Sequence, residues 1–116
     1  MGASSKYIAG VTIRAVERWK AVLAPTSVSG APIVEIINHG VTLQWLKVVA
    51  PTTGACDLTP TGIAAYEVDD VQIVANRVLA DPKGPTIGGS CGLANGIEVG
   101  DLSARASVRN NLVRDF

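Results

Sequence analysis

Residues 88–92, Gly-Gly-Ser-Cys-Gly, are the part of the chain whose residue types could support nucleophilic chemistry. A serine hydroxyl or a cysteine thiol becomes reactive when a neighbouring base takes its proton and a carboxylate orients that base. The chain has a single histidine, His39, and Glu35 or Asp57 could orient its imidazole ring. The sequence therefore offers one candidate set for a small hydrolase.

Ser90 matches the G-x-S-x-G pattern of the α/β-hydrolase nucleophile elbow, and Cys91 is similar to the G-x-C-G string of chymotrypsin-like viral cysteine proteases. In α/β-hydrolases the histidine follows the serine along the chain, whereas His39 precedes it. The protease order fits, but that fold needs two β-barrels, more than 116 residues can form. We therefore expect a glycine-rich loop here and predict that the protein is not an enzyme.

Metal-ligating residue types are too few and too scattered to predict a metal or cofactor site. Cys56 and Cys91 show no zinc-site spacing with each other or with the single histidine. Without a secretory signal, two thiols are favoured over a disulfide, and the disulfide stays the alternative. Glu67, Asp69 and Asp70 could offer oxygen ligands to Ca²⁺, but they fit no EF-hand loop, so a solvated turn is expected.

Basic side chains gather near the C-terminus, and acidic ones near the middle of the chain. This separation suggests that arginines of one subunit pair with the acidic turn of a neighbouring subunit. The apolar Phe116 at the end of the sequence is expected to dock on the domain or on a neighbour. The predicted interface residues are Glu67, Asp69, Asp70, Arg105, Arg109, Arg114 and Phe116.

The composition of the chain predicts that part of the protein surface is covered by other protein chains. Charged residues are 17% of the chain, hydrophobic residues are 47%, and ten basic residues balance ten acidic ones. A usual charged fraction is about 25%, and a net charge near zero favours self-association. It also disfavours binding to nucleic acid or to an anionic membrane. Neither a signal peptide nor a membrane span is predicted.

β-Branched residues interrupted at short intervals by Gly and Pro predict short strands. Residues 33–37 and 41–49 are expected to pair as a hairpin through Asn38-His39-Gly40. Residues 7–23 fit a strand followed by a helix as well as two strands. No internal repeat is evident. Further strands are expected at 62–68, 71–79, 97–99 and 102–109, and a helix capped by Asp101 is the alternative for the last of these.

The fold class predicted from this pattern is mainly β: a single domain spanning residues 1–116, folded as a β-sandwich or small barrel, with one N-terminal helix as an open alternative. Residues 110–116 would form a C-terminal tail docked on the domain or on a neighbouring subunit. The expected core consists of Val11, Ile13, Trp19, Ile36, Val41, Leu43, Trp45, Val71, Ile73, Val78 and Val108.

In size and composition the chain resembles the small virion proteins of tailed phages, such as capsid decoration or cement proteins and neck or tail rings. The resemblance implies a homo-oligomer that bridges coat or tail subunits in the virion; otherwise a cytoplasmic protein is expected. An alternative is a β-sandwich module that binds carbohydrate or another ligand through exposed aromatic residues. Trp19 and Trp45 are expected in the core, so this alternative depends on an exposed pair.

Overall fold

The computed structural model describes residues 10–25, 31–51, 61–80, 95–100, 102–114 and 116. All regular structure in these residues is β-strand, which confirms the mainly β prediction. The strands are β1 (Val11–Arg14), β2 (Val22–Leu23), β3 (Val34–Ile36), β4 (Val41–Gln44), β5 (Lys47–Ala50), β6 (Thr61–Tyr66), β7 (Gln72–Val74), β8 (Arg77–Ala80), β9 (Asn95–Gly100), β10 (Ser107–Arg109) and β11 (Leu112–Arg114).

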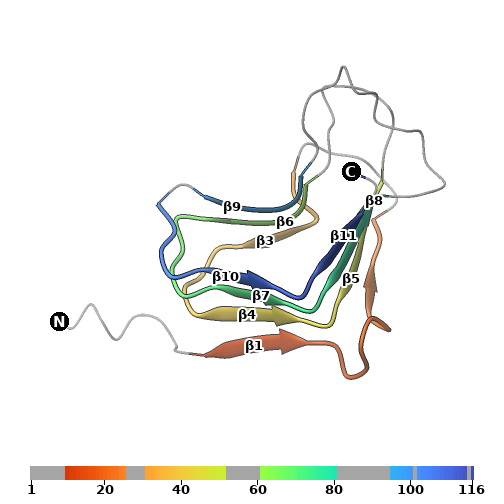
Figure 1. The fold of residues 1–116 in the computed structure, drawn as a ribbon, viewed down its shortest axis with the longest axis horizontal. Coiled ribbons are helices and arrows are strands. Elements are labelled where there is room, and N and C mark those ends of the chain that lie inside the picture. Colours follow the sequence, from red (N-terminus) through yellow and green to blue (C-terminus); the bar gives the residue numbers. More distant parts are fainter. Residues whose placement is uncertain (1–9, 26–30, 52–60, 81–94, 101, 115) are drawn as a thin grey trace, which may run out of the picture.

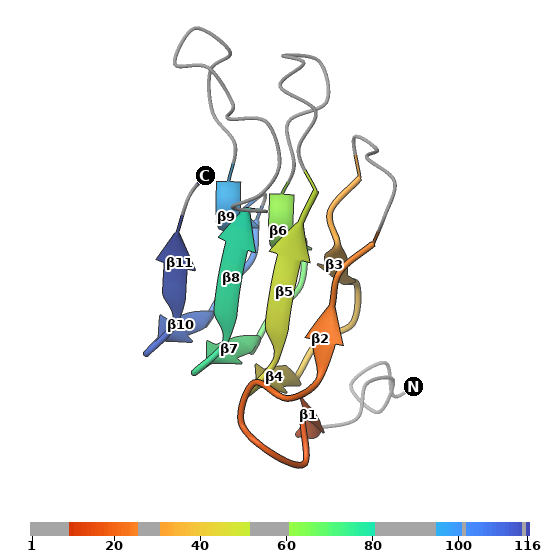
Figure 2. The same ribbon diagram turned by 90° about the vertical axis from the view of Figure 1, so that its right-hand side faces the viewer.

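The strands form three parallel sheets, and each strand pairs with the strand three places later in the chain. The first sheet has the order β1-β4-β7-β10, the second β2-β5-β8-β11, and the third β3-β6-β9. The chain therefore winds as a coil that visits the three sheets in turn (Figures 1 and 2). This arrangement is a parallel β-solenoid, in which each coil contacts only the coils before and after it.

A sandwich or barrel was predicted, and the parallel pairing departs from both. Sandwiches and small barrels are built from antiparallel neighbours joined by hairpins. The predicted hairpin is wrong, because β3 belongs to the third sheet and β4 to the first. The predicted strand 41–49 is in fact β4 and β5, which lie on different sheets. Residues 10–25 contain two short strands and no helix.

The coils contain a repeat that was not evident in the sequence. Val41 pairs with Val11, and Gln72 pairs with Thr42, so 30 positions separate these partners. Ser107 pairs with Gln72 at 35 positions. Four of the five extra positions lie in the connection from the second sheet to the third, and one lies between β9 and β10. This variable period hides the repeat of the short apolar strands.

The core consists of columns of inward-pointing side chains, one from each coil. Ile13, Leu43, Ile73 and Val108 form one column in the first sheet. Alternation along each strand turns every second residue inward, which is why apolar residues recur at these positions. Of the predicted core, six residues are buried: Ile36, Val41, Leu43, Val71, Ile73 and Val78.

Of the other five predicted core residues, Trp45 packs half-buried against the core cluster, and the remaining four are not part of the buried core. Val11, Ile13 and Val108 point inward but lie in the terminal coils of the described residues, where no further described strand pairs beyond them, and they are exposed. Trp19 and Trp45 are only half-buried and lie at the corner between the first and second sheets.

Tight corners between sheets depend on residues with positive φ at matching places in successive coils. Gly10, Gly40, Asp70 and Arg105 precede the first strand of their coils, with φ of 79°, 73°, 58° and 55°. Glycine adopts this conformation freely, and Asp tolerates it better than most residues. Backbone hydrogen bonds join the corners, from Val11 N to Gly40 O and from Asp70 N to Ala104 O.

Candidate interaction surfaces

The candidate hydrolase residues are not assembled by the described part of the chain. Asp57, Ser90 and Cys91 lie outside the described residues, as does Cys56. His39 lies at the corner between β3 and β4, where its Nδ1 accepts a hydrogen bond from Asp69 N at 2.8 Å. Nδ1 is therefore engaged with backbone and is not free to take a proton from a nucleophile.

Possible metal ligands do not converge either. Among the residues that the structure describes, no group of three His, Cys, Asp or Glu side chains is placed to hold a metal ion. The Asp69 and Asp70 carboxylates instead take donors from their own chain.

The acidic turn and Arg105 meet at the corner that leads into the first sheet, on adjacent coils. Arg105 Nε and Nη2 donate to the Asp70 carboxylate at 2.7 and 3.1 Å. Asp69 Oδ1 accepts from Ala104 N at 2.9 Å, and Asp69 Oδ2 lies 3.7 Å from Arg105 Nη2. Bidentate arginine–carboxylate pairs are the strongest ion pairs of this kind. These predicted interface residues therefore join two coils of one chain.

We expect this pair to make the acid stability of the protein depend on Arg105. The hydrogen bond from the Arg105 guanidinium holds the pKa of Asp70 below its ordinary value of 3.8. Because the folded-state pKa is lowered, the stabilisation is present above pH 3.8 and is lost as the pH falls through the lower, folded-state pKa. Arg105→Gln should raise the pKa of Asp70, measured by carboxyl-carbon NMR titration, and move acid unfolding to higher pH. A pKa of Asp70 that is the same in both proteins would contradict this.

The remaining predicted interface residues lie apart from that corner. Arg109 Nη2 approaches Gln72 Oε1 at 3.5 Å, on the outer side of the first sheet. Glu67 is exposed in the turn after β6, and Arg114 ends β11. Phe116 packs against the hydrophobic core cluster. Residues 112–114 are not a tail, because β11 continues the second sheet.

The two ends of the solenoid expose the apolar interior. In the first-sheet column, Ile13 is 52% exposed and Val108 48%, while Leu43 and Ile73 between them are 2% and 0% exposed. The second sheet repeats the pattern, because its outermost inward side chains are likewise exposed and its middle ones buried: Leu23 at 41%, Val48 at 0%, Val78 at 0% and Val113 at 43%.

The same ends carry sheet edges. β1, β2 and β3 are the outermost strands at one end, and β9, β10 and β11 at the other. An outermost strand presents backbone N–H and C=O groups that can pair with another strand. Solenoids normally need terminal repeats with polar outer faces for solubility. The described residues form no polar cap of this kind at either end of the solenoid. We call the two end surfaces, formed by β1, β2 and β3 and by β9, β10 and β11, the open ends.

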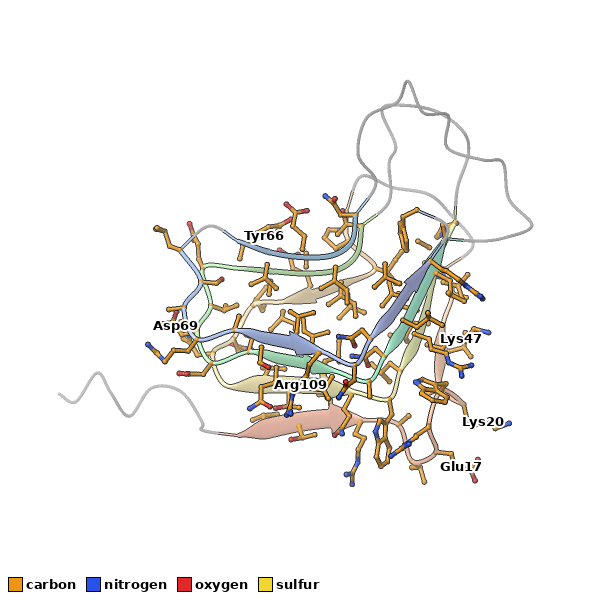
Figure 3. The ribbon with its side chains drawn as sticks, viewed as in Figure 1. Glu17, Lys20, Lys47, Tyr66, Asp69 and Arg109 are labelled. Carbon is orange, nitrogen blue, oxygen red and sulfur yellow. The ribbon has the colours of Figure 1, made fainter. Side chains whose placement is uncertain are left out.

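A second surface lies at the corner between the first and second sheets. The Arg77 guanidinium stacks on the Trp19 ring at 3.8 Å, and those of Arg14 and Arg18 lie 4.8 and 5.1 Å from the Trp45 ring. Trp19 Nε1 also donates to Ala75 O at 2.9 Å. Lys20 and Lys47 project beside this cluster, and Glu17 is the acidic residue there (Figure 3). We call Arg14, Arg18, Lys20, Lys47 and Arg77 the basic corner.

Sequence reasoning missed both surfaces. The basic corner gathers residues from three coils, and no local motif joins positions 14 and 77. A usable signal for the open ends was the similarity of Val11-Thr-Ile, Val41-Thr-Leu, Val71-Gln-Ile and Ala106-Ser-Val. Such recurrence at 30 to 35 positions indicates stacked coils.

The comparisons with known proteins identify no family to which the chain is similar. No protein-family model matches the chain, and neither a curated protein nor a solved structure matches it. In the described residues, no helix is long and apolar enough to cross a membrane.

Proposed function

We propose that the chain is a non-enzymatic structural protein that joins other subunits of a larger assembly through its open ends. A virion component of a tailed phage, such as a capsid decoration or cement protein, fits this role. The observation that carries the proposal is the exposure of inward-pointing apolar side chains at both ends of the solenoid. A soluble solenoid needs these columns covered, and another protein chain covers them best.

The energies agree with a protein–protein contact. Five inward-pointing apolar side chains of the terminal strands are 39–52% exposed: Val11, Ile13, Leu23, Val108 and Val113. Burying the exposed half of one such side chain contributes about 1 kcal/mol. Together with the strand edges, these contributions are comparable to the 4–15 kcal/mol that association costs, by rough estimate.

The test is the solution mass, measured by size-exclusion chromatography with light scattering at two concentrations. The wild-type protein should form a dimer or larger species. Ile13→Lys and Val108→Lys should each lower the mass, because a charge would have to be buried at the joined end. Val16→Lys is the matched control, since Val16 is 96% exposed in the connection between β1 and β2. Circular dichroism should show all four proteins folded.

Two results would contradict the proposal. One is a monomeric wild-type protein at both concentrations. The other is an oligomer that persists at high salt, about 500 mM NaCl, and that Ile13→Lys and Val108→Lys leave intact. The alternative of a carbohydrate-binding module gains no support from Trp19 and Trp45, because arginines of the same chain lie over both rings.

A further inference from the structure

The basic corner is a concentration of positive charge on a chain whose net charge is zero. It holds five of the ten basic residues, and none of the five forms an ion pair with another residue that the structure describes. Lys47 and Arg77 are direct partners on β5 and β8, so their like charges lie on neighbouring strands. Like charges placed side by side are unfavourable unless an anionic group lies between them. The corner is therefore suited to an anionic partner.

The geometry of the arginines favours carboxylates as that partner. Stacking on Trp19 and Trp45 holds the three guanidinium groups in place, which lowers the entropy cost of binding them. Their N–H edges remain able to bind a carboxylate with two hydrogen bonds. Nucleic-acid bases would stack on aromatic faces, but arginines lie over these faces here. Trp and Arg are also the residues most enriched where protein interfaces bind most strongly.

A matching acidic face exists on the same chain, on the other side of the core. Glu35 and Glu98 flank Ala64 on the third sheet, and Glu67 directly follows β6, the middle strand of that sheet. Among the described residues, none of these carboxylates has an ion-pair partner, although Glu98 accepts a hydrogen bond from Asn95. Figure 3 shows Tyr66 of β6 on one side of the molecule and Lys20 and Lys47 on another.

We propose that the basic corner of one copy binds the acidic face, Glu35, Glu67 and Glu98, of a second copy. This lateral contact rests on the proposed structural function, but it uses a surface separate from the open ends. Each copy offers both halves of the contact, so the association is head-to-tail and either closes into a ring or extends. Most of these charged residues are exposed, and Lys47, Arg77 and Glu98 are half-buried, so salt screens the contact, in contrast to the apolar open ends.

The experiment uses two charge-reversal variants that leave the Trp–Arg contacts intact. One carries Lys20→Glu and Lys47→Glu; the other carries Glu35→Lys and Glu98→Lys. We expect sedimentation velocity of the wild-type protein to show an associated species that dissociates as NaCl is raised from about 50 to about 500 mM, because salt screens attraction between charged side chains over this range. Each variant alone should lack that species. An equimolar mixture of the two variants should restore it, because each reversed surface then meets a complementary one.

The controls separate this proposal from the open-end contact. Ile13→Lys and Val108→Lys should leave the salt-sensitive species unchanged, so loss of the end contact and loss of the lateral contact are distinguishable. Reversing Glu17, the acidic residue beside the basic corner, to Lys should not weaken lateral association. A wild-type protein without a salt-sensitive species, or a mixture of the two variants that stays dissociated, would overturn the proposal.

Discussion

Replacing Asn76 with alanine is expected to lower the free energy of unfolding by about 3 kcal/mol. Asn76 is 1% exposed at the corner between β7 and β8. Its Oδ1 accepts from Leu46 N at 3.0 Å, and its Nδ2 donates to Leu43 O at 3.0 Å. Alanine would remove the acceptor of the buried Leu46 N and one donor to Leu43 O, and losing a buried hydrogen bond of this kind costs about 1–3 kcal/mol.

Asn76 also connects to the next coil, so its loss should weaken two coil junctions together. Its Nδ2 donates to Asn111 Oδ1 at 3.1 Å, and Asn111 Nδ2 donates to Ile73 O at 2.8 Å. Leu46, Asn76 and Asn111 occupy the same place in three successive coils, as the pairing of their neighbours shows. The amides thus satisfy backbone groups at a corner where strand pairing is interrupted.

Urea unfolding followed by circular dichroism measures this effect as a lower midpoint at an unchanged slope. Asn76→Leu separates hydrogen bonding from volume. Leucine fills the space, as Leu46 does one coil earlier, yet it cannot accept from Leu46 N or donate to Leu43 O. It should therefore still destabilise by more than about 1 kcal/mol. Asn38→Ala is the control, because Asn38 is exposed at another corner. If Asn76→Leu were as stable as the wild type, the hydrogen bonds of the Asn76 amide would not be what stabilises this corner.

Strand content was predictable from the sequence, whereas strand partners were not. Alternating β-branched residues predicted strands in 41–49 and 71–79, and β-strands do occupy most of these ranges. Each range is broken by a corner, at Trp45 and at Ala75, where φ is 63° and 54°. Neither residue type signals a positive φ, so a continuous strand was predicted. Pairing direction depends on contacts 30 or 35 positions away, which local periodicity does not report.

The candidate site was predictable only in part, for a similar reason. The acidic turn and Arg105 were identified by charge, and the structure brings them together, but within one chain. The basic corner could not be identified, because the coil path alone places Arg14 near Trp45 and Arg77 near Trp19. The exposure of Ile13 and Val108 has no local signal either, since the same residue types are buried in the middle coils.

Gly62→Ala should destabilise the protein by about 3 kcal/mol, while Gly100→Ala should change stability by less than about 0.5 kcal/mol. A Cβ on Gly62 would lie 2.6 Å from Gly96 O and would overlap Cγ1 of the fully buried Val78. The coil interior has no room to move these atoms, because β6, β8 and β9 pack tightly there. A Cβ on Gly100 meets nothing within 4 Å, which makes it the matched control on a neighbouring strand.

A double variant then separates the two contacts at Gly62. Val78→Ala in the Gly62→Ala background removes the side-chain overlap but keeps the approach to Gly96 O. Gly62→Ala should therefore destabilise the protein less in the Val78→Ala background than in the wild type, but its effect should not vanish. The difference between the two effects, a coupling energy measured by chemical denaturation, should be about 1 kcal/mol. A double variant as stable as Val78→Ala alone would show that only the Val78 side chain excludes the methyl group. Unchanged stability of Gly62→Ala itself would contradict the close packing of the third sheet against the second, on which the solenoid interior depends.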